Sequence, residues 1–160
     1  MQRNRHPIKP GNNLIFSYSL IALQFAFIGI LIFFIFIQTP YVMNVFALTI
    51  QILSGFIALW AVLHLQHNWR INILPDPRTG ATLVQTGPYQ YIRHPMYFSI
   101  LLFFTTSVVS QPTPDSILVL VLLFAVLIYK LHYEEQLLVE QVMGYRKYQR
   151  EAKKLIPFIY

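Results

Sequence analysis

The chain has 160 residues, of which 56% are hydrophobic and only 11% are charged. Soluble globular domains carry about 25% charged residues, so this composition excludes an ordinary soluble domain and indicates a membrane protein. The formal net charge is +6, and the chain contains no cysteine. Disulfides and thiolate chemistry are therefore excluded.

Four apolar stretches predict an all-α membrane bundle of about four transmembrane spans, in a single domain covering residues 1–160. The first two, 14–37 and 42–63, contain no charged residue. The third, 95–109, is short, and the fourth, 117–133, contains only Lys130. The proline-rich segment SQPTPDS between them predicts a tight turn. Residues 134–160 predict a short cytosolic helical tail that Gly144 interrupts.

The basic residues predict the orientation. The N-terminal arm, the connection 64–94 and the segment after Tyr129 together hold all 12 lysines and arginines. With four spans these segments lie on one side of the membrane, which predicts that both termini are cytosolic. The expected location is the bacterial inner membrane or another cytosol-facing membrane. Membrane lipids with anionic head groups are the predicted partners of these charges, and nucleic acid is not.

Polar residues gather on that side at two places. In GPYQYIRHPMYFS, residues 87–99, Pro95 is predicted at the first position of the third span, with His94 at its cap. A helix start offers unpaired N–H groups that suit a carboxylate. At the end of the fourth span, Lys130 precedes the glutamate pair Glu134 and Glu135. Ordinary boundary anchoring, with Lys130 paired to Glu134, is the alternative interpretation.

GPYQYIRHPMYFS, followed by EEQLL and GYRKYQ, resembles the isoprenylcysteine carboxyl methyltransferase family and the related phospholipid N-methyltransferases. The family signature RHPxYxG corresponds to residues 93–99, and its later glutamate pair corresponds to Glu134 and Glu135. TLVQTGPY, residues 82–89, is also similar. Two positions differ: Ser99 stands where the family usually has glycine, and Lys130 where the eukaryotic prenylcysteine enzymes carry a substrate-binding arginine.

The resemblance implies an integral-membrane methyltransferase that uses S-adenosylmethionine, most like a protein-S-isoprenylcysteine carboxyl O-methyltransferase. The family's cofactor contacts fall on Leu83, Val84, Tyr89, His94, Pro95, Met96, Tyr97 and Glu134. The chemistry of these residues agrees. Glu134 can accept from the ammonium or the ribose hydroxyls, and the helix-start N–H groups near His94 can bind the carboxylate. Tyrosine rings can contact the adenine or the sulfonium.

The methyl acceptor stays open between two chemistries. A lipophilic or prenylated carboxylate arrives ionised and needs only positioning, for which Lys130 or Arg93 would serve. A phospholipid amine must first lose a proton, for which Glu135 or His132 would serve as the base.

Two other readings use the same residues differently. A di-iron site would have to draw on scattered histidines and has too few ligands, so no metal is predicted. The residues in question are His64, His67, His94 and His132. A non-enzymatic membrane scaffold or assembly subunit is the second alternative, and it would have no affinity for the cofactor.

Overall fold

The computed structural model describes residues 10–38, 44–65, 83–157 and 159–160. Its helices are α1 (Pro10–Ile32), which continues as a π-helical segment (Phe33–Gln38), α2 (Val45–Leu65), α3 (Pro95–Ser110), α4 (Pro114–Gln141) and α5 (Tyr145–Glu151). A short 3-10 turn (Gly87–Gln90) precedes α3. The described residues form no strand, which confirms the predicted all-α membrane bundle.

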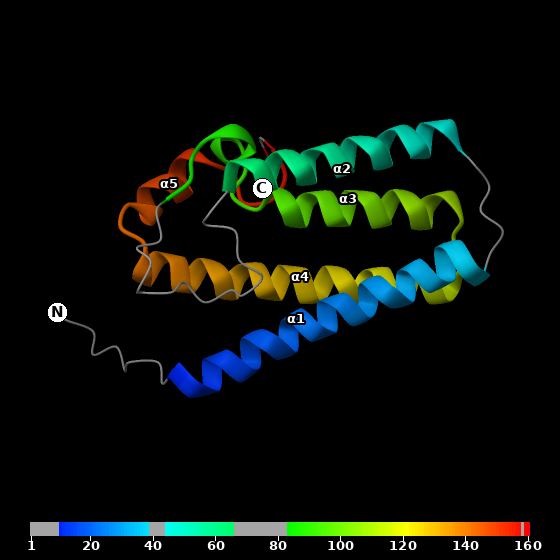
Figure 1. Ribbon diagram of the computed structural model, residues 1–160, viewed down its shortest axis with the longest axis horizontal. Helices are drawn as coiled ribbons and strands as arrows, with labels where there is room; N and C mark the ends of the chain where they lie inside the picture. The colour runs from blue at the N-terminus through cyan, green and yellow to red at the C-terminus, as the bar shows by residue number, and fades with distance from the viewer. Residues whose placement is uncertain (1–9, 39–43, 66–82, 158) are drawn as a thin grey trace.

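The four long helices run alternately up and down along one axis (Figure 1). Helix α2 packs along α3, and α1 packs along α4. The cores of α3 and α4 join around Leu123, Leu127 and Leu131, which are almost completely buried. Helix α5, the 3-10 turn and the start of α3 lie together at the end of the bundle where α4 finishes (Figure 1).

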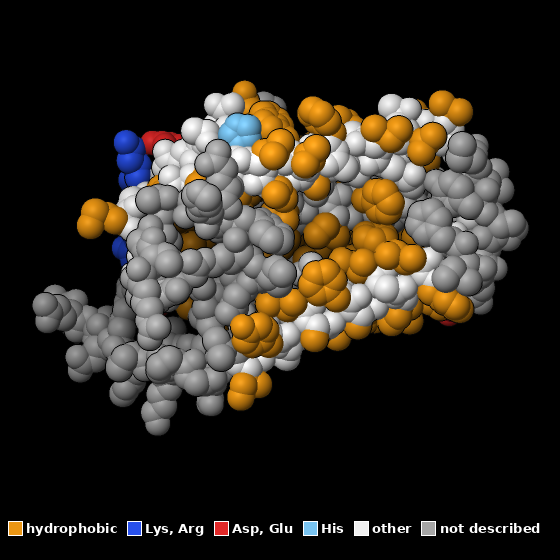
Figure 2. Space-filling model, in the orientation of Figure 1, with side chains coloured by type: hydrophobic (Ala, Val, Ile, Leu, Met, Phe, Trp, Pro, Cys, Tyr) orange, Lys and Arg blue, Asp and Glu red, His pale blue; other side chains and the backbone are white. Residues whose placement is uncertain are grey.

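Three of the helices are long and apolar enough to cross a membrane: Ile15–Ile35, Val45–Leu65 and Pro114–Gln141. Helix α3 has 16 residues. At 1.5 Å per residue it spans about 24 Å, less than the roughly 30 Å of a bilayer core. Hydrophobic side chains cover the visible face along the helices, whereas Lys and Arg gather at the α5 end (Figure 2). The chain is therefore an integral membrane protein.

The fourth predicted span and the helix predicted for the first part of the tail are continuous in the structure. The fourth apolar run and the first part of the predicted tail form one helix that passes through Tyr133 and ends at Gln141. The segment EEQLLVEQ consists mostly of good helix formers, and Leu137 within it is buried, so nothing ends the helix at the polar boundary. Gly144, in the left-handed conformation with a φ of 84°, is the residue immediately before α5 and caps its N-terminus. The glutamate pair therefore sits on a rigid helix rather than at the root of a tail.

Candidate cofactor and acceptor site

The start of α3 is fastened by the segment that follows α5. Ile92 forms an isolated parallel bridge with Lys153. The Arg93 N–H donates to the Lys153 carbonyl at 2.8 Å, and the His94 N–H donates to the Lys154 carbonyl at 3.2 Å. Pro95 stands at the first position of the helix, as predicted. Because the His94 amide is engaged, the helix-start donors left for a ligand are the N–H groups of Met96 and Tyr97.

The side chain of Arg93 joins α3 to α4 and to α5. Its Nε donates to Glu135 Oε1 at 2.6 Å, with both side chains less than a tenth exposed. Its Nη1 donates to the carbonyls of Gln149 and Ala152. Lys154 Nζ lies 3.5 Å from the other Glu135 oxygen. Arg93 and Glu135, both predicted as catalytic, thus already have close partners within the fold.

Glu134 has a different environment from its neighbour. It accepts a hydrogen bond of 2.8 Å from the Tyr97 hydroxyl, and its side chain keeps 26% of its surface exposed. The His94 ring stacks on the Tyr97 ring, with the two planes at 2°. The His94 ring also lies between the two carboxylates, with its Nδ1 3.8 Å from Glu134 and its Nε2 3.4 Å from Glu135. Of the two glutamate side chains, that of Glu134 is the more exposed, at 26% against 9% for Glu135.

Lys130 is buried one helical turn before Glu134, at 5% exposure. Its Nζ donates to Gln24 Oε1 of α1 at 2.7 Å and lies 5.3 Å from the centroid of the Tyr97 ring. The pairing of Lys130 with Glu134 that the sequence left open is therefore not the contact that forms. Tyr97 instead lies between the two side chains, with its ring toward the ammonium and its hydroxyl on the carboxylate.

The remaining predicted cofactor residues lie around the same end of the bundle. Tyr89 is buried in the 3-10 turn, and its carbonyl accepts from the Tyr148 hydroxyl. Burial and the nearby charge of Glu134 raise the pKa of Tyr89 well above its usual value. Leu83 packs on a cluster formed by Val142, Tyr145, Tyr148 and Ala152, and Val84 follows it in the chain with partial exposure. The structure thus joins both Tyr89 and Leu83 to residues of α5.

The two positions that differ from the family signature are both accommodated. Ser99 is buried, and its hydroxyl donates to the Met96 carbonyl one turn earlier at 2.8 Å. The extra hydroxyl is thus satisfied inside α3. Lys130 keeps a positive charge at its position, but as a point charge rather than the planar fork of an arginine.

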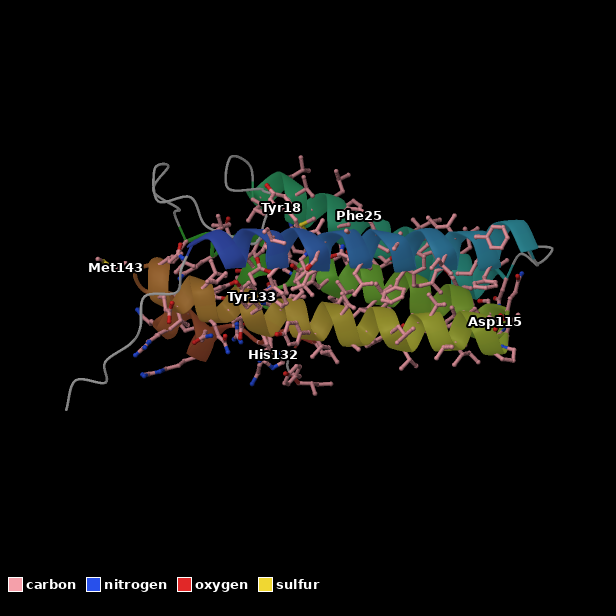
Figure 3. All side chains as sticks on the ribbon, turned by 90° about the horizontal axis from the view of Figure 1, so that it is seen from below. Tyr18, Phe25, Asp115, His132, Tyr133 and Met143 are labelled. Carbon is pink, nitrogen blue, oxygen red and sulfur yellow. The ribbon has the colours of Figure 1, made fainter. Side chains whose placement is uncertain are left out.

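The described histidines, His64, His94 and His132, lie apart from one another or have other partners. His132 faces outward from α4, with Nδ1 2.7 Å from the Ile128 carbonyl and Nε2 3.4 Å from Lys154 Nζ. Figure 3 labels it on the half of α4 toward Met143. His64 ends α2, and His67 lies outside the described residues. Within the described ranges, no three His, Asp or Glu side chains are placed to hold a metal ion.

A family model described as "Isoprenylcysteine carboxyl methyltransferase (ICMT) family" matches residues 46–140. The chain belongs to this family. The match takes in α2, α3 and nearly all of α4, including the glutamate pair, but neither α1 nor α5. No curated protein matches the chain significantly. Family membership implies a membrane methyltransferase, as the resemblance predicted.

Two residues at this site were missed by the sequence analysis. Gln24 lies in an uncharged apolar run, where a single amide gives no pattern to detect. Tyr145 is buried on α5, and its hydroxyl has no hydrogen-bond partner in the part of the chain that the structure describes. Burial, followed by the charges of Glu135 and Glu134, raises the pKa of Tyr145 well above its usual value, so the hydroxyl stays neutral. The motif GYRKYQ contained Tyr145 and could have drawn attention to it.

Proposed function

We propose that the protein is an S-adenosylmethionine-dependent methyltransferase that methylates a lipophilic carboxylate at the cytosolic membrane face, most like a protein-S-isoprenylcysteine carboxyl O-methyltransferase. The observation that carries the proposal is the arrangement around Tyr97. A partly exposed carboxylate, Glu134, lies on one side of this residue, and a buried ammonium, Lys130, lies on the other. One site thus offers an anion for a cationic cofactor and a cation for an anionic acceptor.

The residues fit the cofactor's functional groups. S-adenosylmethionine carries an ammonium, a sulfonium, a carboxylate and an adenosine. Glu134 would accept from the ammonium or the ribose, and the N–H groups of Met96 and Tyr97 would donate to the carboxylate. Tyr89 would supply an aromatic surface. Among the described residues the buried Tyr145 hydroxyl has no hydrogen-bond partner, so it would be a further donor. Leu83 and Val84 would give apolar contact, beside His94 and Pro95.

When bound, this cofactor supplies an electrophilic methyl group, which forms a bond to a carboxylate oxygen as its bond to sulfur breaks and the sulfonium becomes a neutral thioether. The chain's own residues have three tasks. Lys130 holds the acceptor carboxylate, Glu134 and the start of α3 hold the cofactor, and the apolar bundle excludes water. No proton has to move, because the acceptor arrives ionised.

The contacts of the two base candidates support a carboxylate acceptor over an amine. A base has to hold a free lone pair close to the proton that it removes. Glu135 is committed to Arg93 and Lys154. His132 faces outward, against Lys154. The buried Lys130 ammonium would also repel a protonated amine.

Orientation follows from the same proposal. We place the α5 end of the bundle in the cytosol, where S-adenosylmethionine is made. The basic residues of α5 and of the segment after it lie at this end and suit anionic lipid head groups.

Calorimetry on the purified chain in detergent tests the cofactor assignment. The wild type should bind S-adenosylmethionine with a dissociation constant in the micromolar range, which corresponds to a binding free energy of roughly −8 kcal/mol. Glu134→Gln should weaken this binding by about 1.5–3 kcal/mol, the contribution of a charge-assisted hydrogen bond. Glu140→Gln, on an exposed position of the same helix, is the matched control and should bind like the wild type.

Two results would count against the assignment. Wild-type affinity in Glu134→Gln would remove this carboxylate from the cofactor site. No binding by the wild type would favour the non-enzymatic scaffold. Transfer of a labelled methyl group to a prenylcysteine acid, compared with transfer to phosphatidylethanolamine, then distinguishes carboxyl from amine methylation.

A further inference from the structure

We infer that Gln24 of α1 is a positioning residue for the methyl acceptor: it holds the Lys130 ammonium, and the two side chains form an anion-binding pair that selects a lipophile with a carboxylate. This inference rests on the proposed function and deepens it. It assigns the choice of acceptor partly to α1, a helix that lies outside the region that matches the family.

The contact joins two distant and buried positions. Gln24 is 6% exposed and Lys130 is 5% exposed. The 2.7 Å hydrogen bond between Lys130 Nζ and Gln24 Oε1 connects residues 106 positions apart in the chain. It crosses the packing surface between α1 and α4, which Figure 3 shows running side by side. Burial removes both groups from competing water, so the hydrogen bond fixes where the ammonium lies.

The hydrogen bonds of this ammonium are incomplete. A lysine ammonium has three donors, of which Gln24 takes one, and the Tyr97 ring faces the group from another direction. Among the described residues, no carboxylate lies within ion-pair distance of Lys130. The nearest candidate, Glu134, accepts from the Tyr97 hydroxyl instead. A buried charge inside a membrane helix is costly without an anion, so the remaining donor is suited to one that a ligand brings.

The identity of residue 24 matters because an amide orients the ammonium without neutralising it. A carboxylate at this position would close an ion pair and cancel the charge that the acceptor needs. An amide also keeps N–H donors of its own that can serve the same anion. Lys130 and Glu134 are four residues apart on α4 and so share one face of the helix, which places the anion-binding pair beside the proposed cofactor contact.

The test compares the binding of an acid with that of its neutral ester, so that it does not depend on turnover. The probes are N-acetyl-S-farnesylcysteine and its methyl ester, titrated into the purified full chain in detergent. The wild type should prefer the acid by at least about tenfold, the effect of one charge-assisted hydrogen bond. Gln24→Glu and Lys130→Met should each reduce this preference to about onefold, because the site charge is then neutralised or absent.

The controls separate a positioning role from a structural one. Gln51 is also a buried glutamine that bonds between helices, donating to Ser107 at 2.8 Å, but it lies between α2 and α3. Gln51→Met should therefore keep the acid preference. Affinity for S-adenosylmethionine should stay at the wild-type level in Gln24→Glu, since the residue acts on the acceptor. Gln24→Met, which removes the amide and leaves the charge, should raise KM for the acid with little change in kcat.

Each result then decides a different point. An acid preference that survives in Gln24→Glu overturns the inference. So does a wild type that binds S-adenosylmethionine yet binds acid and ester equally well, and in that case the cofactor assignment stands. A wild type that binds no S-adenosylmethionine overturns the proposed function itself.

Discussion

The guanidinium of Arg93 donates to oxygens from two parts of the chain, the Glu135 carboxylate and the carbonyls of Gln149 and Ala152. Lys154 approaches Glu135 from the other side. These contacts hold the start of α3, the end of α4 and the segment after α5 in fixed relation. We therefore expect Arg93 and Glu135 to position the site rather than contact the acceptor.

Glu135→Gln should destabilise the protein more than any exposed charge deletion. Removing the carboxylate leaves the buried Arg93 without its anion, a change that costs about 3–5 kcal/mol for a buried pair. Thermal unfolding in detergent measures the effect. Glu151→Gln is the control, because its ion pair with Lys147 is exposed and should contribute less than about 1 kcal/mol. Equal effects of the two substitutions would contradict the structural role of Glu135.

For single residues, the sequence predicted which side chains gather at the site, but not which of them are already paired with other residues of the fold. The signature at residues 93–99 and the glutamate pair indicated the right cluster. Glu135 is engaged because Arg93 is held beside it by the carbonyls of Gln149 and Ala152. The positions of these carbonyls follow from the break at Gly144 and the bridge at Lys153, which the sequence does not show. Gln24 could not be predicted, because one amide in an apolar run resembles any other until α1 is placed against α4.

Among the elements, the 3-10 turn that carries Tyr89 is fitted closely to the end of α2. Gly87 begins this turn with a φ of 60°, and a Cβ at this position would lie 2.5 Å from the His64 ring. His64 itself is oriented by a contact of 3.0 Å between its Nδ1 and the Trp60 carbonyl. A glycine is therefore required here both by the backbone conformation and by the neighbouring ring.

Gly87→Ala should lower stability by about 1–3 kcal/mol, the usual cost of a strained backbone residue, and should displace the turn. Because Tyr89 sits in that turn, affinity for S-adenosylmethionine should fall as well. Gly29→Ala and Gly55→Ala are controls, since nothing lies within 4 Å of a Cβ at either position. Thermal unfolding and calorimetry of the three variants check the prediction. A Gly87→Ala protein that behaves like the controls would show that the turn adapts freely.

Hydrophobicity predicted the helices well, but by itself it does not mark where α4 ends. Long uncharged runs have to form helices in a bilayer, because backbone groups find no other partners there. At Glu134 the side chains change from apolar to polar, but the backbone hydrogen bonds of the helix continue. Helix α4 therefore continues to Gln141, as its residues' intrinsic preferences allow.

Among the described residues, one end of the bundle is rich in basic residues and the opposite end has none, and the orientation of the whole molecule can be measured directly. Asp115 and Met143 are exposed and lie at opposite ends of α4 (Figure 3). Since the chain has no cysteine, Asp115→Cys and Met143→Cys each introduce a single label site. A membrane-impermeant maleimide should label residue 143 in inverted vesicles and residue 115 in intact cells. Labelling of both from the same side would contradict the spanning arrangement.

The bridge between Ile92 and Lys153 also sets an order of assembly during synthesis. The ribosome makes the start of α3 well before the segment 149–154 whose carbonyls receive the Arg93 and His94 donors. Until it emerges, these donors have only water and lipid head groups as partners. The candidate site therefore becomes native only after the segment 149–154 has docked against the start of α3.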